Sequence, residues 1–218
     1  LSLLTPFSWV FQQLAGRKRR RSETHQARYQ SPIPIIVVGN ITAGGTGKTP
    51  VVIALANWLT QEGYKPGVIS RGFGGSSKHL IRVNAASDPA LVGDEPLMIE
   101  ASTGVPTVCC RDRVQAAIHL GETTDCNVII SDDGLQHYPL PRNFEIVVID
   151  GLRGFGNGRL LPAGPLREKP SRLQEVDCIL VNGPDQFKVA PASALSIAVE
   201  IDHLLEAKTA QTVSLDGI

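Results

Sequence analysis

A glycine-rich segment between two apolar runs constrains this chain more than any other feature. Residues 37–50 read VVGNITAGGTGKTP and end in the Gly-Lys-Thr of a phosphate-binding loop. An apolar run precedes the loop and a helical pattern follows it, which is the strand-loop-helix context that such a loop requires. Thr42 replaces the first glycine of the usual motif G-x-x-x-x-G-K-[ST]. Because that position shapes the turn and does not touch the transferred phosphate, a nucleotide site is still predicted.

The residues of this loop have distinct predicted roles in binding a nucleotide. The glycines allow backbone N–H groups to turn toward phosphate oxygens. Lys48 is expected to neutralise the β- and γ-phosphates, and the Thr49 hydroxyl is expected to be a Mg²⁺ ligand. The predicted nucleotide-binding residues are Thr42, Ala43, Gly44, Gly45, Thr46, Gly47, Lys48 and Thr49.

Short apolar runs alternate with helical patterns along most of the chain. The runs cover residues 33–40, 65–72, 105–110, 126–134, 144–151 and 176–183, and the helical patterns cover 48–63 and 111–122. Continuous apolar strands interleaved with helices are typical of a parallel sheet covered on both faces. The predicted fold is therefore α/β and P-loop NTPase-like, with a mainly parallel sheet. Such sheets bind ligands at the carboxyl ends of their strands, so the residues after each run are the candidates for chemistry.

Two adjacent acids follow one of these runs. A phosphate-loop enzyme needs an acid at the end of a neighbouring strand to hold or orient the metal, and Asp132 and Asp133 meet this requirement. Because adjacent like charges repel unless a cation joins them, the pair favours a metal site over a solvated turn. Asp150, at the end of the next run, is a competing metal ligand. Gln136 and His137 follow the pair directly and are expected on the same rim.

The segment VGDEP, residues 92–96, precedes another helical stretch. A phosphoryl acceptor hydroxyl needs a carboxylate to take its proton, and Asp94 is a candidate for that base. The alternative is that Asp94 caps the helix that follows. Arg71, Arg111 and Arg113 also follow apolar runs, a position from which arginines can clamp phosphate groups.

Three further segments have patterns that can indicate function. The loops 71–75 and 151–170 are rich in Gly, Pro and Arg, and a long loop without periodicity in a compact domain is usually functional or disordered. Residues 181–185, VNGPD, have the N-x-x-D spacing by which many GTPases read guanine. Gly183 stands where that motif has a lysine, so we interpret the segment as a turn.

The N-terminal segment has its own pattern. Phe7, Val10, Phe11 and Leu14 lie at i, i+3, i+4 and i+7 of a helical repeat, with Trp9 beside them, and the run RKRRR follows. Such a stripe next to clustered cations suits a helix in a membrane interface, and it also suits a helix packed on its own domain. A signal peptide is not expected, because the positive charges follow the apolar stretch. No apolar run approaches the ~18–20 residues that span a bilayer.

Charge and cysteine content separate the N-terminal segment from the rest. The first 30 residues contain six of the 21 basic residues against one acid, so the remainder has 15 basic and 20 acidic residues. The two regions are therefore expected to meet different partners, and no nucleic acid is expected among them. The cysteines lie in or beside apolar runs without a C-x-x-C pair, which is typical of reduced core residues. They are Cys109, Cys110, Cys126 and Cys178.

Several blocks of the chain together resemble one enzyme family. They are GNITAGGTGKTP, VISRGFGG, VGDEP, RDRVQAA, SDDGLQHYPLPRNFEIVVIDGLRGFGNGRLLPAGPLRE and VDCILVNG. Over about residues 32–183 the chain resembles the tetraacyldisaccharide 4'-kinases, which act in lipid A synthesis in Gram-negative bacteria. The blocks DDGLQH and GNGRLLPAGPLRE are far more specific to that family than the phosphate loop is. The N-terminal segment also looks like the family's membrane-docking helix.

The resemblance implies a kinase that transfers the γ-phosphate of ATP, with Mg²⁺, to the 4'-hydroxyl of tetraacyldisaccharide 1-phosphate and so forms lipid IVA. It implies a lipid substrate and a peripheral location at the cytoplasmic face of the bacterial inner membrane. It also implies two segments: an amphipathic membrane-docking helix with a basic segment over residues 1–30, and a P-loop kinase domain over residues 31–218.

The same resemblance implies roles for particular residues. Asp94 is the expected base, and Arg71 is expected near the substrate. The block DDGLQH, residues 132–137, is called the acid segment and is expected to line the active site. The catalytic set implied is Asp94, Lys48, Asp133, Gln136, His137 and Arg71, and the metal ligands implied are Thr49, Asp132 and Asp133.

The chain departs from the family's pattern at its end. The family continues through an A-G-I-G-x-P-x-x-F-F type segment and supplies a histidine that pairs with the catalytic aspartate. This chain stops at Ile218 before such a segment, and His203 does not lie in that context. The chain also begins at Leu1 without a methionine. We therefore expect a fragment that lacks the C-terminal part of the family's fold.

Two other classes of function stay open at this point. A nucleotide-dependent switch or metallochaperone can share G-G-x-G-K-T, but such proteins typically carry a lysine where this chain has Ala43. A preference for GTP over ATP would favour that class. A non-enzymatic nucleotide-binding remnant is favoured only if the 218 residues are the complete natural product.

Overall fold

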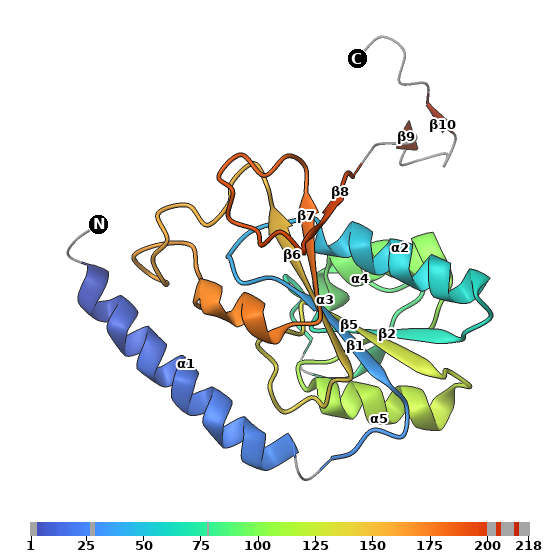
Figure 1. The fold of residues 1–218 in the computed structure, drawn as a ribbon. Coiled ribbons are helices and arrows are strands. Elements are labelled where there is room, and N and C mark those ends of the chain that lie inside the picture. The colour runs from blue at the N-terminus through green and yellow to red at the C-terminus, as the bar shows by residue number, and fades with distance from the viewer. Residues whose placement is uncertain (1–3, 27–28, 78, 200–203, 206–211, 214–218) are drawn as a thin grey trace.

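The fold is built on one eight-stranded sheet with the strand order β3-β4-β2-β5-β1-β6-β7-β8 (Figure 1). The computed structural model describes residues 4–26, 29–77, 79–199, 204–205 and 212–213, and His203 lies outside them. The strands of the sheet are β1 (Ile35–Gly39), β2 (Pro66–Ser70), β3 (Ile81–Arg82), β4 (Thr107–Cys109), β5 (Val128–Asp132), β6 (Phe144–Asp150), β7 (Cys178–Asn182) and β8 (Leu195–Ile197). A separate antiparallel pair joins β9 (Leu204–Leu205) and β10 (Thr212–Val213).

The predicted mainly parallel sheet is confirmed. All neighbouring strands of the sheet pair in parallel except β3, which runs antiparallel to β4. The helices are α1 (Thr5–Gln26), α2 (Lys48–Gln61), α3 (Pro89–Val92), α4 (Asp94–Thr103) and α5 (Arg113–Thr123), with the 3-10 helix η2 (Pro170–Glu175). Figure 1 shows α2 and α4 on one side of the sheet and α5 on the other, as the sequence predicts.

Alternate residues of the central strand enter two separate cores. Val38 packs on one face with Val51 of α2 and Ile99 of α4, whereas Val37 packs on the other face with Ala117 of α5. Both valines are fully buried, because a parallel strand between two layers has no solvent face. The predicted core cysteines also hold, since the four thiols are unpaired and buried or half-buried.

Strand register brings the candidate residues to one edge of the sheet. Val38 of β1 lies opposite Asp132 of β5, and Gly39 lies opposite Val147 of β6. The phosphate loop that leaves β1 and the acids that end β5 therefore emerge side by side. Asn182, at the end of β7, reaches the same edge two strands away from β1.

The segment from residue 151 to 170 is held against the start of the phosphate loop. Thr42 forms a bridge with Leu166, the Ala43 N–H donates to the Pro165 carbonyl (2.7 Å), and the Arg167 N–H donates to the Ile41 carbonyl (2.7 Å). Leu166 is buried in a core cluster with Ile41. The 151–170 segment is therefore ordered by its contacts with the start of the phosphate loop.

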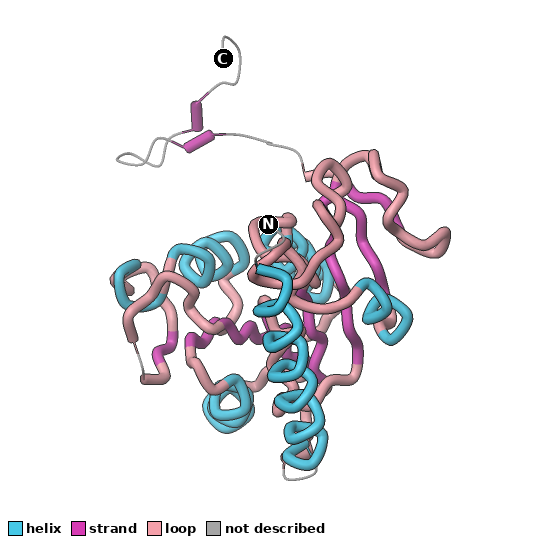
Figure 2. The backbone as a smooth tube through the Cα atoms, turned by 90° about the vertical axis from the view of Figure 1, so that its left-hand side faces the viewer, coloured by secondary structure: helices cyan, strands magenta, loops and turns pink. Residues whose placement is uncertain are grey.

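Helix α1 lies along the outside of the domain (Figure 2). It touches the 151–170 segment through Ser8, whose hydroxyl donates to the Leu160 carbonyl (2.8 Å) and accepts from the Ala163 N–H (3.1 Å). Phe7 and Trp9 stay 63% and 65% exposed. The helix thus contacts its own domain through Ser8 and through Arg19, which pairs with Glu175, and it leaves apolar side chains outside. No helix within the described residues has the length and apolar character of a membrane span.

Candidate functional site

The phosphate loop has the backbone shape that its glycines permit. Gly44 and Gly47 have φ angles of +103° and +89°, which only glycine adopts without strain. Gly47 is the N-cap of α2, so the loop ends at a helix N-terminus, where N–H groups favour an anion. Thr46, Lys48 and Thr49 are buried, whereas Gly44 and the following glycine are exposed.

Lys48 and the second acid form the centre of the site. The Lys48 Nζ lies 3.6 Å from Asp133 Oδ1. Arg167 Nη1 donates to both carboxylate oxygens of Asp133 at 3.0 Å. Burial alone would raise the pKa of Asp133, but Lys48 and Arg167 outweigh it and hold the pKa below its ordinary value. Asp133 adopts a φ of +45°, a conformation that aspartate tolerates better than most residues.

The first acid is held differently from its neighbour. Asp132 is 1% exposed, and its Oδ2 accepts from the Ser70 hydroxyl at 3.2 Å. Burial, followed by the nearby charges of Glu95 and Asp133, raises the pKa of Asp132 to about 6. Its Oδ1 is buried and has no hydrogen-bond partner within the described residues. A buried carboxylate with an open oxygen fits a cation that arrives with the ligand.

The oxygen atoms near the phosphate loop can be compared with the ligands that a nucleotide-bound metal uses. Within the described part of the chain, no three His, Cys, Asp or Glu side chains gather into a metal-binding group. Mg²⁺ is usually held by one or two carboxylates together with water and substrate phosphates. Asp132, Asp133 and the Thr49 hydroxyl supply oxygen ligands of that kind, so the residues fit the metal that the sequence predicts.

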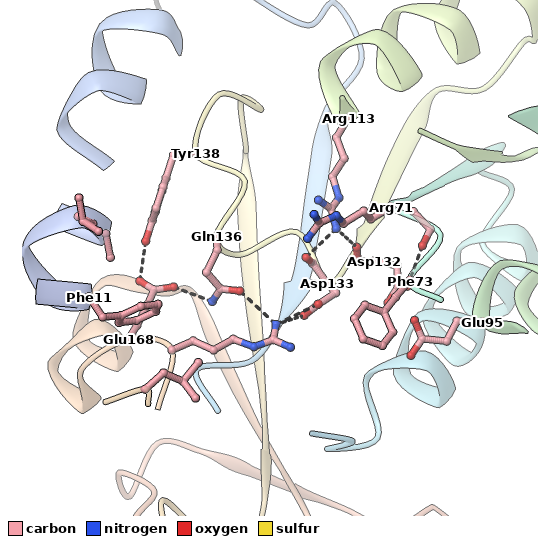
Figure 3. Close-up of a pocket in the computed structure, with 15 residues that line it drawn as sticks. Phe11, Arg71, Phe73, Glu95, Arg113, Asp132, Asp133, Gln136, Tyr138 and Glu168 are labelled. Carbon is pink, nitrogen blue, oxygen red and sulfur yellow. Dashed lines mark hydrogen bonds and ion pairs between the residues drawn. The ribbon is translucent and has the colours of Figure 1, made fainter. Parts of the chain in front are cut away.

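A cavity of about 490 Å³ opens beside the acid pair (Figure 3). Polar and charged side chains come from the strand ends, from α4 and α5 and from the 151–170 segment, and apolar side chains come from α1 and from loops. Phe73 lies near Glu95, and Phe11 lies near Glu168 (Figure 3). The polar and charged lining comprises Ser70, Arg71, Glu95, Arg113, Asp132, Asp133, Gln136, Tyr138, Arg167 and Glu168, and the apolar lining comprises Phe11, Leu14, Ala15, Phe73 and Leu161. The site is therefore amphipathic.

A carboxylate outside the predicted set organises the middle of this cavity. Glu168 Oε1 accepts from Gln136 Nε2 at 2.7 Å, and Glu168 Oε2 accepts from the Tyr138 hydroxyl at 2.8 Å (Figure 3). Gln136 Nε2 also donates to the Asn40 carbonyl (2.9 Å). The predicted placement of Gln136 on the rim agrees with this geometry, and its amide links the acid segment to the start of the phosphate loop.

The three candidate arginines divide into different environments. Arg71 is exposed and lines the cavity, where it can meet an anion. Arg113 is 4% exposed, and its Nη2 donates to the carbonyls of Asp132 (3.0 Å) and Asp133 (2.8 Å). Burial lowers the pKa of Arg113. Arg113 therefore fixes the backbone of the acid pair, while Arg111 is exposed outside the cavity lining.

Three of the expected catalytic residues do not line this cavity: Lys48, which still reaches Asp133 at its edge, and Asp94 and His137. Asp94 is exposed in the first turn of α4. Gly93 is the N-cap of that helix, so the alternative that Asp94 caps it is wrong. Its neighbour Glu95 lines the cavity instead. His137 is half-buried, and its carbonyl accepts from Arg142 Nη2 at 2.7 Å.

The competing metal ligand is engaged elsewhere. Asp150 is paired with the Arg153 side chain and accepts the backbone N–H of Leu152 (3.0 Å). It lines a separate cavity of about 320 Å³ with Thr42 and Ala43. Asp150 thus closes the turn after β6, where its carboxylate is already engaged by Arg153.

The interpretation of residues 181–185 as a turn agrees with the structure. Asp185 accepts the N–H groups of Val189 (3.1 Å) and Ala190 (3.0 Å), which closes a local turn. Asn182 Nδ2 donates to the Thr46 carbonyl (3.3 Å). The asparagine is therefore turned toward the phosphate loop.

Sequence reasoning missed Glu95, Tyr138, Arg167 and Glu168 as site residues. Glu95 is adjacent to the predicted Asp94, and Tyr138 follows the predicted acid segment, so proximity was an available signal. Arg167 and Glu168 lie in the family-specific block that ends in PLRE. Without the fold, no spacing rule connects that block to Asp133, 34 residues earlier.

Comparisons with known proteins show what the chain is similar to. The family described as tetraacyldisaccharide-1-P 4'-kinase matches residues 1–216. Tetraacyldisaccharide 4'-kinases of Methylobacillus flagellatus and Nitrosococcus oceani are each 52% identical to the chain, over 83% and 84% of its length and 55% of theirs. The chain thus spans about half the length of the curated relatives it matches. The crystal structure of LpxK from Aquifex aeolicus in complex with ATP has a TM-score of 0.74 at 27% identity, covering 90% of this chain and 64% of that one.

Proposed function

The chain belongs to the tetraacyldisaccharide-1-phosphate 4'-kinase family, and from this premise we propose that it transfers the γ-phosphate of ATP to the 4'-hydroxyl of a tetraacylated glucosamine disaccharide 1-phosphate, forming lipid IVA. One observation carries the proposal: a single cavity is lined both by the acid pair with nearby arginines and by apolar side chains of α1. A lipid with a phosphorylated sugar head has both kinds of surface.

The nucleotide side of the mechanism uses the phosphate loop and the acid pair. The loop N–H groups and Lys48 bind the β- and γ-phosphates. Thr49, Asp132 and Asp133 are the residues that would hold Mg²⁺, which when bound neutralises charge on the phosphate oxygens. We propose that Arg167, which pairs with Asp133, contacts the transferred phosphoryl group.

The acceptor side needs a base and a sugar-binding surface. We propose that Asp94 takes the proton of the 4'-hydroxyl, as the family resemblance implies, although Glu95 is the carboxylate of that turn that lines the cavity. Arg71, Gln136 and His137 are proposed to orient the sugar and its 1-phosphate. The distinction between the two adjacent acids is testable by substitution.

We also propose that α1 docks the protein on the cytoplasmic face of the inner membrane as a peripheral protein. Four of its large apolar side chains face outward: Phe7 (63% exposed), Trp9 (65%), Val10 (48%) and Leu14 (58%). Apolar side chains followed by a basic run suit the boundary between acyl chains and anionic headgroups. Leu14 also lines the cavity, so lipid held there would lie next to the membrane surface.

Transfer of labelled phosphate from ATP to the lipid acceptor tests the proposed activity. Lys48→Ala is expected to reduce the rate at least about 10³-fold because it removes charge stabilisation of the transferred group. Lys65→Ala, which changes an exposed lysine paired with Asp125, is the matched control and should retain full rate. An unaffected rate in Lys48→Ala would refute the proposed nucleotide site.

The same assay separates the two acids and the competing class of function. Asp94→Ala is expected to lose turnover while it still binds ATP, whereas normal turnover in Asp94→Ala with loss in Glu95→Ala would move the base to Glu95. A nucleotide-dependent switch or metallochaperone would instead hydrolyse GTP in preference to ATP and leave the lipid unphosphorylated.

A further inference from the structure

We propose that Asn40 and Asn182 are positioning residues that hold the phosphate loop between them in the shape that binds phosphate. The proposal rests on the proposed function for the identity of the ligand, ATP. The two side chains come from the carboxyl ends of β1 and β7, and both donate to the same loop residue, Thr46. The loop is therefore held from two strands that are not neighbours.

Asn40 holds the loop from within the domain. Its side chain is fully buried, and its Nδ2 lies 3.3 Å from the Gly44 carbonyl oxygen and 3.3 Å from Thr46 Oγ1. Because a carbonyl oxygen only accepts, the contact with Gly44 requires the amide nitrogen on that side. One amide group thus spans the turn of the loop at two points.

The orientation of Asn40 leaves its other amide atom without a bond. Its Oδ1 is buried and has no hydrogen-bond partner among the residues that the structure describes. A buried polar atom in this state is costly, and such atoms are characteristic of strained or functional positions. The contacts of Asn40 Nδ2 with the phosphate loop therefore account for its buried position, since its Oδ1 gains no hydrogen bond there.

Asn182 holds the loop from the other side. Its Nδ2 donates to the Thr46 carbonyl at 3.3 Å. The approach is close, since a Cβ on Gly47 would lie 2.6 Å from this nitrogen, and Gly47 already has a φ of +89°. The positive φ favours glycine at 47, and the Asn182 amide fills the space that a Cβ would take. The asparagine of the N-x-x-D segment thus packs against the loop that precedes α2.

Two points of attachment matter because the loop is rich in glycine. Glycine has more conformations to lose than any other residue when a loop becomes ordered. When a ligand binds only one shape of a loop, its apparent affinity falls in proportion to the fraction of protein molecules that have that shape. Donors from Asn40 and Asn182 raise the populated fraction of the bound shape before ATP arrives. Loss of either donor is expected to weaken ATP binding without changing the site for the acceptor.

Binding and kinetic measurements on single variants test this role. The variants are Asn40→Ala and Asn182→Ala, and the matched control is Asn143→Ala, whose side chain accepts from the Ile35 N–H (2.9 Å) at the opposite end of β1. One lost hydrogen bond corresponds to a roughly 2- to 13-fold change. We expect the Kd for ATP, from titration calorimetry, to rise about fivefold in Asn182→Ala and about tenfold or more in Asn40→Ala. The Asn143→Ala variant should match wild type.

Two further readouts distinguish positioning from a general loss of structure. The KM for ATP is expected to rise in both asparagine variants while the KM for the lipid acceptor stays at the wild-type value. Hydrogen exchange in the nucleotide-free protein is expected to become faster at residues 43–49 and to stay unchanged in the remaining strands. If Asn40→Ala does not fold, Asn182→Ala carries the test alone, because Asn182 is only half-buried.

The outcomes separate this proposal from the proposed function. Wild-type exchange at residues 43–49 in both variants, a wild-type Kd for ATP, or a parallel rise in the KM of both substrates would overturn the role of the asparagines. A wild-type protein that binds no ATP would overturn the proposed function. In that case faster loop exchange in the variants would still support the positioning role, since exchange is measured without nucleotide.

Discussion

Replacement of Glu145 by glutamine is expected to destabilise the protein strongly, although it changes only one oxygen to an amide. Glu145 is 6% exposed on β6. Its Oε1 accepts from Arg142 Nη1 (2.8 Å) and from Arg172 Nη2 (2.6 Å), and its Oε2 accepts from the same Arg172 nitrogen (2.6 Å). Arg172 is 5% exposed. The substitution therefore removes the shared countercharge of two guanidinium groups, one of them buried.

The magnitude follows from the partners that remain. Breaking a buried ion pair costs about 3–5 kcal/mol when the remaining charge is left uncompensated. Arg172 keeps weaker contacts with Glu168 (3.5 Å) and Glu175 (3.6 Å), so the lower end, about 3 kcal/mol, is expected for Glu145→Gln. At roughly 2–4 °C per kcal/mol for a chain of this size, Tm falls by about 6–12 °C.

The loss should depend on pH in a defined direction. Burial opposes ionisation of Glu145, but the hydrogen bonds from Arg172 and Arg142 outweigh it and lower its pKa. A carboxyl group with a lowered pKa in the folded state contributes stability above its unfolded pKa of about 4.3, and that contribution is lost as pH falls through the folded pKa. The difference between wild type and Glu145→Gln is therefore full at pH 7.5 and shrinks below about pH 4.

Urea denaturation followed by circular dichroism at several pH values measures both effects. Lys65→Met is the matched control, because the ion pair that it breaks is exposed on both sides and such pairs contribute little. A loss below about 1 kcal/mol in Glu145→Gln at pH 7.5, or a loss that stays constant into the acid range, would refute the reasoning.

Three further predictions concern the turn before α4, the metal and the membrane. Gly93→Ala puts a Cβ 2.3 Å from the Phe73 carbonyl oxygen, at a residue with φ +83° and ψ +163°. The free energy of unfolding, measured with urea, should fall by about 2 kcal/mol or more, and a wild-type value would disprove the contact. EDTA should weaken ATP binding to wild type and leave Asp132→Asn unaffected in calorimetry, whereas an equal effect on both would remove Asp132 from the metal site. Trp9→Ser should reduce co-sedimentation with anionic vesicles while Tm stays unchanged. The control Trp58→Ser, which changes an exposed tryptophan of α2, should co-sediment like wild type. Equal binding by all three proteins would contradict membrane docking through α1.

The parts of the structure that local patterns determine were predictable from the sequence. Runs such as 33–40 and 144–151 became the strands β1 and β6 because uninterrupted apolar residues suit a strand covered on both faces. The phosphate loop was predictable because its glycines, Lys48 and Thr49 are consecutive. The acid pair was predictable because β5 ends there in a parallel sheet whose carboxyl ends share one edge.

Choices that depend on distant contacts were not predictable. Asp94 and Glu95 are consecutive at the start of α4, and only the packing of that helix decides which one faces the cavity. The apolar stripe of α1 indicated a helix. It did not indicate which residues contact the domain, and these include Ser8, whose hydroxyl donates to the Leu160 carbonyl, and Arg19, which pairs with Glu175. No local pattern in either segment contains that information.

The 151–170 segment joins the two halves of the proposed reaction. Near its middle it binds α1 through the contacts of Ser8 with Leu160 and Ala163. Three residues after Ala163, Leu166 pairs with Thr42 at the start of the phosphate loop. The apolar wall supplied by α1 and the phosphate-binding edge of the sheet are therefore held at a separation set by a few consecutive residues. The proposed transfer, from a donor in water to an acceptor in a membrane, needs such a fixed spacing, and the backbone bridge between Thr42 and Leu166 is one of its attachment points.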